Sequence, residues 1–290
     1  MTNDLPFIGQ LTRRPMTNRT FSRFSEFIHT ECGIKMPPTK KTMLEARLSK
    51  RLRSLGMDSF EDYCDYVFST EGFEGELANM VEVVTTNKTD FFREPKHFDY
   101  LLETALPAVI NARGPGESKK VGVWSAGCST GEEPYTLAMV LNEFAEQCRG
   151  FRYSILATDI SMKVLEKAAM GIYEEANTDP IPPALQKKYL MKSKDRSKGF
   201  VRIVPELRSA VRFRRLNFMD GDFGIREPLD IIFCRNVIIY FDRPTQEMLL
   251  NRLCRYLIHG GYIFMGHSET LNGLDVPLAL VTTTVYRKQG

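Results

Sequence analysis

Apolar residues in the first third of the chain recur at every third or fourth position, as on one face of a helix. The pattern extends over residues 18–84 and is broken at Pro37 and Pro38, which interrupt helices. The clearest stripe comprises Leu44, Leu48, Leu52 and Leu55. It ends at Gly56, and glycine often follows the last turn of a helix. This part of the chain is therefore predicted to be a small all-helical domain.

After Pro95 the pattern changes to short apolar segments that alternate with amphipathic ones. The predicted strands are 121–125, 153–157, 211–216, 229–234 and 262–265, with a closing strand or hairpin over 278–287. The predicted helices are 97–112, 133–147, 161–169 and 245–257, and a turn is predicted at 114–116. Strands that are apolar throughout and alternate with helices are typical of a mainly parallel sheet covered on both faces. We therefore expect an α/β domain.

The alternation is interrupted between Tyr173 and Arg208. Three prolines open this stretch, a short helix is predicted near 184–189, and an exposed strand is predicted over 199–204. We interpret the stretch as an insertion that forms a small β-hairpin subdomain. Insertions on α/β scaffolds often carry partner contacts, although a purely structural excursion remains an alternative.

Composition excludes several classes of protein. No run of eighteen apolar residues is present, and residues 1–15 mix charged and apolar positions, which predicts a flexible leader and no signal peptide. The six cysteines form no CxxC pair, and the four histidines are scattered, so we expect reduced thiols and no metal site. The predicted organisation is this leader, a helical domain (16–84), a linker (85–98) and an α/β domain (99–290) with an insertion at about 174–208.

The net charge of +3 favours no particular partner, but its distribution is uneven. Residues 35–53 carry seven lysines and arginines against Glu45 alone. The basic positions on the predicted leucine helix are Arg47, Lys50, Arg51 and Arg53. Taken alone, they fit a solvated helix face as well as a docking surface for an acidic partner.

The first predicted strand leads into a turn of small residues, which lets a ligand approach the backbone closely. The acids Glu132 and Glu133 follow at the start of the next helix. Acids at this turn would repel a pyrophosphate and favour a ligand with a cationic head, such as the amino group of a methionine moiety. The alternative is a helix cap, because Thr130 and Glu133 match a capping box.

Two further strands end in polar residues at the same expected edge of the sheet. Asp159 follows the second strand, where an acid accepts hydrogen bonds from ribose hydroxyls or caps the next helix. Arg235 and Asn236 follow the strictly apolar strand 229–234. The Pro-Pro-Tyr run expected of a base-modifying DNA methyltransferase does not follow, which counts against base amines as substrates.

Together these stretches resemble the chemoreceptor glutamate methyltransferase family (CheR). The matching runs, in the family's order, are 85–94, 129–135, 158–160, 171–173, 233–236 with 240–242, and 266–269. The resemblance covers the chain from about Met16 to its end. It implies a helical N-terminal domain followed by a Rossmann-like methyltransferase domain with a small inserted β-subdomain. It also implies S-adenosylmethionine as methyl donor and S-adenosylhomocysteine as product.

The resemblance also implies roles for individual residues. Those expected to bind the cofactor, three of them from the linker, are Asn87, Thr89, Arg93, Glu133, Asp159, Asn217, Phe218, Arg235 and Asn236. Glu133 would hold the methionine end, Asp159 the ribose, and Asn217 with Phe218 the adenine. We expect Arg93 and Tyr240 to orient the incoming carboxylate. The expected reaction gives glutamyl methyl esters on chemoreceptors during chemotactic adaptation.

The expected partner is the cytoplasmic domain of chemoreceptors, with the basic helix guiding docking and no nucleic acid or metal involved. Some family members grip the receptor's C-terminal tail through the β-subdomain and carry a glycine-rich loop there. Residues 192–199 contain one glycine, so tail binding stays open. We expect a cytoplasmic monomer recruited to membrane-bound receptor arrays. The alternatives are methylation of another acceptor and a cofactor-sensing signalling module without activity.

Overall fold

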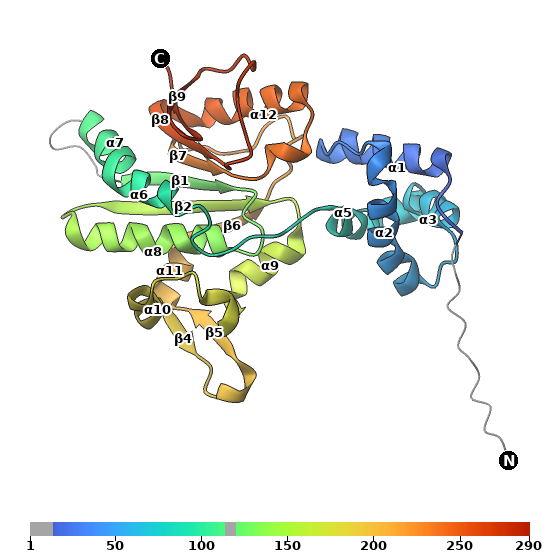
Figure 1. Ribbon diagram of the computed structural model, residues 1–290, viewed down its shortest axis with the longest axis horizontal. Coiled ribbons are helices and arrows are strands. Elements are labelled where there is room, and N and C mark those ends of the chain that lie inside the picture. Colours follow the sequence, from blue (N-terminus) through green and yellow to red (C-terminus); the bar gives the residue numbers. More distant parts are fainter. Residues whose placement is uncertain (1–13, 114–119) are drawn as a thin grey trace. The chain divides into compact units, whose positions relative to one another are not determined.

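The computed structural model describes residues 14–113 and 120–290, so residues 1–13 of the predicted leader and the predicted turn at 114–116 lie outside the described residues. The described chain forms two compact units (Figure 1). The first comprises the residues up to Thr30 and Met36–Thr85, and the second comprises Glu31–Lys35 and Thr86–Gly290. No helix in these residues has the length and apolar character needed to cross a bilayer.

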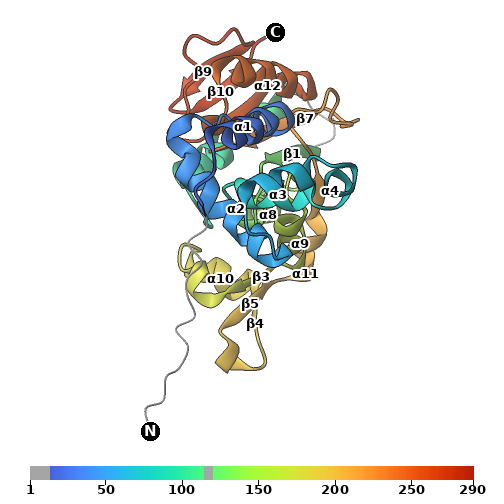
Figure 2. The same cartoon turned by 90° about the vertical axis from the view of Figure 1, so that its right-hand side faces the viewer.

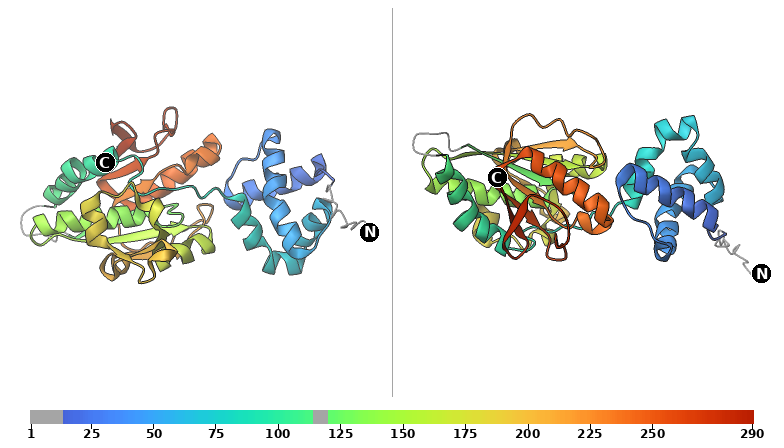
Figure 3. Two further views of the ribbon diagram at one scale, coloured as in Figure 1. Left: turned by 60° about the horizontal axis from the view of Figure 1, so that its bottom comes forward. Right: turned by 90° about the horizontal axis from the view of Figure 1, so that it is seen from above.

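The first unit is a bundle of helices (Figures 2 and 3). They are α1 (Asn18–Cys32), η1 (Pro38–Lys40), α2 (Lys41–Leu55), α3 (Phe60–Val67), α4 (Thr70–Gly75) and α5 (Leu77–Val84). The leucine stripe forms much of its core, because Leu44, Leu48 and Leu52 are fully buried. Leu55 instead is 36% exposed, since α2 ends there and Gly56 turns the chain with a left-handed φ of 66°.

The second unit contains a seven-stranded sheet of order β6-β2-β1-β7-β8-β10-β9. Its strands are β1 (Lys120–Ala126), β2 (Arg152–Asp159), β6 (Val211–Arg215), β7 (Leu229–Cys234), β8 (Leu257–Met265), β9 (Leu278–Thr282) and β10 (Val285–Lys288). The first five strands of that order are mutually parallel, β10 runs antiparallel to its neighbour β8, and β9 runs antiparallel to β10. The carboxyl ends of β2, β1, β7 and β8 therefore lie along one edge, and the predicted Rossmann-like fold class is confirmed.

Helices cover both faces of this sheet. On β1, Val121 and Val123 belong to one buried cluster with α8 (Glu132–Gln147), whereas Trp124 belongs to a second cluster with α12 (Arg243–Tyr256). Figure 1 shows α8 and α12 on opposite sides of the sheet. The helix predicted over 97–112 divides into α6 (Lys96–Tyr100), a π-helical turn (Leu101–Ala105) and α7 (Leu106–Ala112).

The interruption after α9 (Met162–Met170) is a small sheet with three strands, one more than a hairpin has. Its elements are β3 (Ile172–Glu174), η3 (Glu175–Thr178), α10 (Pro183–Tyr189), β4 (Leu190–Lys192), η4 (Arg196–Lys198) and β5 (Phe200–Ile203), followed by α11 (Pro205–Ala210). All three strands are antiparallel, in the order β3-β5-β4. Arg202 pairs with Ile172 on one side and Met191 on the other, and these three side chains are exposed.

Candidate active site

The turns that follow β1 and β2 are joined by the carboxylate of Asp159. Its Oδ2 accepts the backbone N–H of Ser129 at 2.9 Å, and its Oδ1 accepts that of Ser161 at 3.0 Å. The cap of α9 is Ser161, whose side chain accepts from Val164 N, so Asp159 is not the helix cap. The carboxylate therefore lies at the carboxyl edge between two neighbouring parallel strands.

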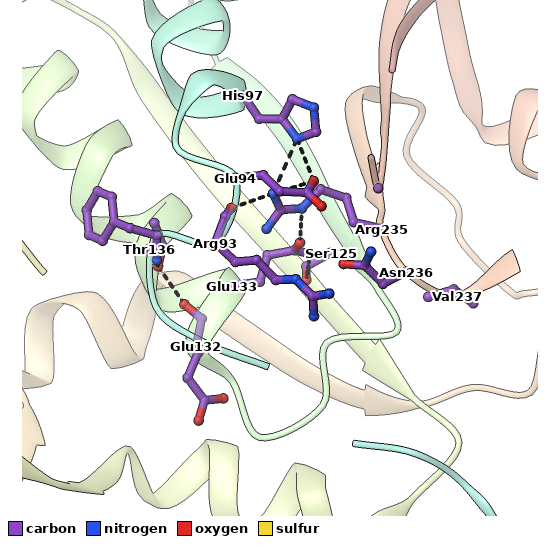
Figure 4. Close-up of polar contacts among 12 residues, drawn as sticks. Arg93, Glu94, His97, Ser125, Glu132, Glu133, Thr136, Arg235, Asn236 and Val237 are labelled. Atoms are coloured by element: carbon purple, nitrogen blue, oxygen red, sulfur yellow. Dashed lines mark hydrogen bonds and ion pairs between the residues drawn. The ribbon is translucent and has the colours of Figure 1, made fainter. Parts of the chain in front are cut away.

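A buried ion pair lies beside this turn (Figure 4). Arg235 Nε donates to Glu133 Oε2 at 2.7 Å, and Ser125 Oγ donates to Glu133 Oε1 at 2.7 Å. These residues come from β1, α8 and the end of β7, and β1 and β7 are neighbours in the sheet. Parallel pairing thus brings together residues that are more than one hundred positions apart in the chain.

The Arg235 guanidinium is held from several sides. Its Nη1 donates to the backbone oxygen of Arg93 at 2.6 Å and lies 3.4 Å from Glu94 Oε2. The aromatic rings of Phe98 and Phe233 lie 5.4 and 5.6 Å from its central carbon, which is cation–π distance. Arg235 is therefore a rigid connection between the sheet and the linker.

His97 is the next member of this network. Arg235 Nη1 lies 3.2 Å from His97 Nδ1, so this nitrogen accepts, and Nε2 carries the proton towards Thr284 Oγ1 at 2.8 Å. Burial, assisted by the nearby Arg235 charge, lowers the pKa of His97 to about 4. His97 is therefore a neutral acceptor at neutral pH.

Glu94, His97 and His267 lie close enough to offer ligand atoms to a metal, all within 4.8 Å of one another. The rings of the two histidines, which appeared scattered in the sequence, are 5.3 Å apart. Glu94 Oε1 also accepts the backbone N–H of His267 at 3.1 Å. The Arg235 guanidinium already faces Glu94 and His97, and it supplies the positive charge of this cluster.

The predicted linker forms one wall of the site. Asn87 O accepts from Ser129 Oγ at 2.9 Å, and Phe92 N donates to Thr136 Oγ1 at 3.1 Å. Thr89 and Arg93 are half-buried in this segment. Figure 4 shows the Arg93 guanidinium in the same region as the side chains of Glu133 and Asn236.

The remaining predicted residues lie in the turns after β6 and β7. Leu216 N donates to Asp159 O at 3.0 Å, which places the following Asn217 and Phe218 next to the turn after β2. Asn217 Nδ2 donates to Glu31 O at 2.6 Å. After β7, Asn236 is left-handed, and Tyr240 is half-buried at the end of the short helix η5 (Ile238–Tyr240).

Backbone strain is concentrated at this site. In the described residues, the non-glycine residues with positive φ are Phe92, Glu94, Ser129, Asn236 and Thr284. Four lie in the linker and in the turns after β1 and β7, and Thr284 contacts His97. Such conformations cost about 1–3 kcal/mol each and persist where surrounding contacts impose them. Their clustering supports a functional role for this edge of the sheet.

One interpretation of the acidic turn was wrong. Helix α8 begins at Glu132 with Gly131 as its cap residue and no side-chain cap, so Thr130 and Glu133 form no capping box. Thr130 Oγ1 donates instead to Glu132 Oε2 at 2.6 Å. Burial raises the pKa of Glu132, and Figure 4 shows this side chain turned away from the Glu133 cluster.

The predicted docking residues are in the first unit and differ in their surroundings. Arg51 forms a two-bond ion pair with buried Glu76, with both distances 2.7 Å. Arg47 Nη1 donates to Val84 O. Lys50 and Arg53 are exposed on α2.

Sequence reasoning assigned no role to Ser125, Glu94, His97 and Ser129 of this site, nor to Glu269, which accepts the backbone N–H groups of the turn after β7. Glu269 had a usable signal, because it follows a buried parallel strand as Asp159 and Arg235 do. His97 had a weaker one, as a polar residue at the start of an otherwise apolar helix face. Its partner Thr284 is 187 positions away, and no local pattern indicates that contact.

Two family models and several curated proteins match this chain. Residues 87–287 match the family model described as CheR methyltransferase, SAM binding domain, and residues 19–85 match CheR methyltransferase, all-alpha domain. A chemotaxis protein methyltransferase from Borreliella burgdorferi is 39% identical over 94% of this chain and 95% of its own length. The protein of that name from Escherichia coli is 38% identical over 99% and 98%. An rRNA methylase structure from Streptococcus thermophilus, 13% identical, covers 71% of this chain and 100% of its own, with a TM-score of 0.37.

Proposed function

The chain belongs to the CheR family of S-adenosylmethionine-dependent methyltransferases, and we propose that it methylates glutamate side chains of bacterial chemoreceptors. Relatives that it matches over nearly their full length are named chemotaxis protein methyltransferases. The observation that carries the proposal is the convergence of Glu133, Asp159, Arg235 and the linker at one edge of the parallel sheet. This is the edge where α/β sheets bind their ligands.

The residues at this edge fit S-adenosylmethionine. A carboxylate offers about four acceptor sites, so Asp159 accepts ribose hydroxyls beside its two backbone N–H groups. Glu133 faces the cationic amino group of the methionine moiety. Gly127 allows the close approach of the turn, because a Cβ there would lie 2.6 Å from Val237 Cγ2. The remaining cofactor contacts in this proposal are Asn87, Thr89, Arg93, Asn217, Phe218, Arg235 and Asn236.

The acceptor chemistry requires little from the protein beyond positioning. S-adenosylmethionine supplies a methyl group that is already electrophilic on its sulfonium. A glutamate side chain, with an ordinary pKa of about 4.3, is ionised at neutral pH and needs no general base. Arg93 and Tyr240 orient this carboxylate, and the apolar residues around the turn after β7 exclude water. Arg93 steers the carboxylate without clamping it, since a tight ion pair would stabilise the ground state.

The proposal includes a partner and a place of action. The exposed charges of α2, Lys50 and Arg53, guide docking of a glutamate-rich receptor helix, together with Arg47 and Arg51. The enzyme acts as a cytoplasmic monomer recruited to receptor arrays. The exposed face of the small sheet, with Ile172, Met191 and Phe200, is where a receptor tail would dock.

The proposal is tested by transfer of labelled methyl from S-adenosylmethionine to a purified receptor cytoplasmic domain. The matched control is the same domain with its methylatable glutamates changed to alanine. We expect base-labile label on the first substrate and none on the second. Label that resists base, or that survives the alanine changes, would indicate another acceptor. S-adenosylmethionine binding without any label would indicate a sensing module and overturn the proposal.

A further inference from the structure

The carboxylate of Glu269, in the turn after β8, is bound by the turn that follows β7. The Glu269 side chain is buried, with the residue 4% exposed. The backbone N–H groups within 3.0 Å of its two oxygens are those of Gly266 (2.6 Å), Val237 (2.8 Å), Asn236 (2.9 Å) and Ile238 (2.9 Å). One side chain therefore connects the exits of two neighbouring parallel strands.

The charge of this carboxylate is balanced by peptide dipoles. Every hydrogen bond that it receives within residues 14–113 and 120–290 comes from a backbone N–H group. Three of the donors are Val237, which precedes the short helix η5, and Ile238 and Ile239, its first two residues. A backbone N–H group is a strong hydrogen-bond donor. These bonds favour the ionised form, whereas burial raises the pKa of Glu269.

The residues of the turn after β7 do not by themselves favour its observed conformation. Val237, Ile238 and Ile239 are β-branched residues that favour extended strands, and Asn236 is left-handed with φ of 59°. Gly266 is also required, because a Cβ there would lie 2.4 Å from Asn236 Nδ2 and 2.8 Å from Asn236 N. Glu269 and Gly266 together therefore impose the conformation of the turn.

We propose that Glu269 is a positioning residue for methyl transfer, holding the turn 236–240 in the shape that receives the acceptor carboxylate. The inference rests on the proposed function, because that turn carries Asn236 and the acceptor-orienting Tyr240. Glu269 touches neither donor nor acceptor in this proposal. It acts through the backbone, so its loss lowers the rate of transfer. Of the proposed cofactor contacts only Asn236 lies in this turn, so cofactor binding changes little.

The test compares Glu269→Gln with a matched control, Asp230→Asn. Glutamine keeps the shape of the side chain but removes the charge and turns an N–H₂ group towards backbone donors. Asp230 is also a buried carboxylate, 2% exposed, which accepts Gly122 N at 2.7 Å and pairs with Arg113 at the opposite end of β7. The Asp230→Asn variant therefore shows what the loss of a buried carboxylate does when the turn after β7 is left unchanged.

Two readouts are needed, kinetics of receptor methylation and hydrogen exchange of the amides at 236–239. For Glu269→Gln we expect kcat to fall by about tenfold to a hundredfold and these amides to lose protection. The Kd of S-adenosylhomocysteine should stay within about threefold of wild type. Asp230→Asn should lose stability but keep kcat and protection at the turn.

A second variant, Gly266→Ala, keeps the carboxylate and displaces Asn236 directly, so we expect the same loss of kcat. Wild-type kcat in Glu269→Gln, or equal losses of kcat in Glu269→Gln and Asp230→Asn, would overturn the inference. Failure of the proposed function gives a different result, since the wild-type protein would then methylate no receptor glutamate. In that case the exchange experiment still applies. If the amides at 236–239 keep their protection in Glu269→Gln, Glu269 does not fix the conformation of the turn.

Discussion

Arg235 and Glu133 form a buried ion pair, with 2.7 Å between Nε and Oε2, at the edge where the parallel strands end. Ser125 and the backbone oxygen of Arg93 satisfy further hydrogen-bonding groups of the pair. A buried pair of this kind contributes less to folding than its Coulomb attraction suggests, because both ions are desolvated. The ion pair instead fixes the position of the Glu133 carboxylate at the place where we expect the cationic group of a ligand.

Changing Glu133 to Gln removes the nearer of the two carboxylates that face the buried Arg235, at 2.7 Å, and leaves Glu94 at 3.4 Å. We expect the free energy of unfolding to fall by about 3 kcal/mol, since removing one partner of a buried pair is costly. We also expect S-adenosylhomocysteine binding to weaken by about tenfold or more. Calorimetry measures the binding, and denaturant titration measures the stability.

The matched control for that change is Glu143→Gln on the same helix, α8. Glu143 pairs with Lys188 at 2.7 Å, and both side chains are about one-third exposed (32% and 38%). Such a pair contributes at most about 1 kcal/mol, so we expect little change in stability and none in binding. Equal effects of the two substitutions would contradict a special role for Glu133.

The sequence predicted the features that depend on residues close together in the chain, or on the common direction of parallel strands. The periodicity of Leu44, Leu48 and Leu52 predicted a buried helix stripe, and all three are buried. Residues at strand ends, such as Asp159 and Arg235, were found because parallel strands deliver their carboxyl ends to one edge. Leu55, the last residue of α2, is 36% exposed, because periodicity alone does not show where burial stops.

The network around Arg235 could not be predicted in the same way. Its contacts with Glu133, Arg93 and His97 join positions that are far apart in the chain and depend on the strand order of the sheet. The third strand of the inserted sheet was missed for a related reason. The three residues Leu190–Lys192 are too few to show an alternation, and they form a strand only because β5 lies beside them.

Substitutions of Arg93 test whether its side chain orients the acceptor carboxylate. Its backbone oxygen is bound by Arg235, so substitution of the side chain leaves that contact in place. We expect Arg93→Ala to lower kcat/KM for receptor by about tenfold to a hundredfold, because the carboxylate is no longer oriented. Arg93→Lys, which keeps the charge but not the planar fork, should recover part of the loss. Wild-type methylation by Arg93→Ala, with S-adenosylmethionine binding measured separately, would eliminate the role.

The lowered pKa of His97 predicts that the free energy of unfolding depends on pH. Its folded-state pKa of about 4 lies below the ordinary histidine value, so between about pH 6.5 and pH 4 the unfolded chain binds a proton that the folded protein excludes. Stability attributable to His97 therefore falls on acidification through this window and levels off below it. The slope attributable to this group is at most about 1.4 kcal/mol per pH unit.

The His97→Gln variant isolates this effect. Glutamine can still accept from Arg235 but does not titrate, so its unfolding free energy should depend less steeply on pH than that of the wild type. Denaturant titrations at several pH values between about 7 and 4.5 measure the difference. Parallel pH curves for the two proteins would show that His97 is not excluded from protonation in the folded state.

The basic helix α2 gives the last prediction, because its charges separate by environment. Lys50 and Arg53 are exposed, so charge reversal to Glu should leave the unfolding free energy nearly unchanged. It should raise KM for receptor and reduce the salt dependence of methylation, because screened attraction guides docking. Arg51→Ala should instead destabilise the first unit by about 3 kcal/mol, since buried Glu76 loses its two-bond partner. The KM for receptor is to be measured in Lys50→Glu and Arg53→Glu from low to high ionic strength. If it equals that of the wild type throughout, α2 is excluded as the docking surface.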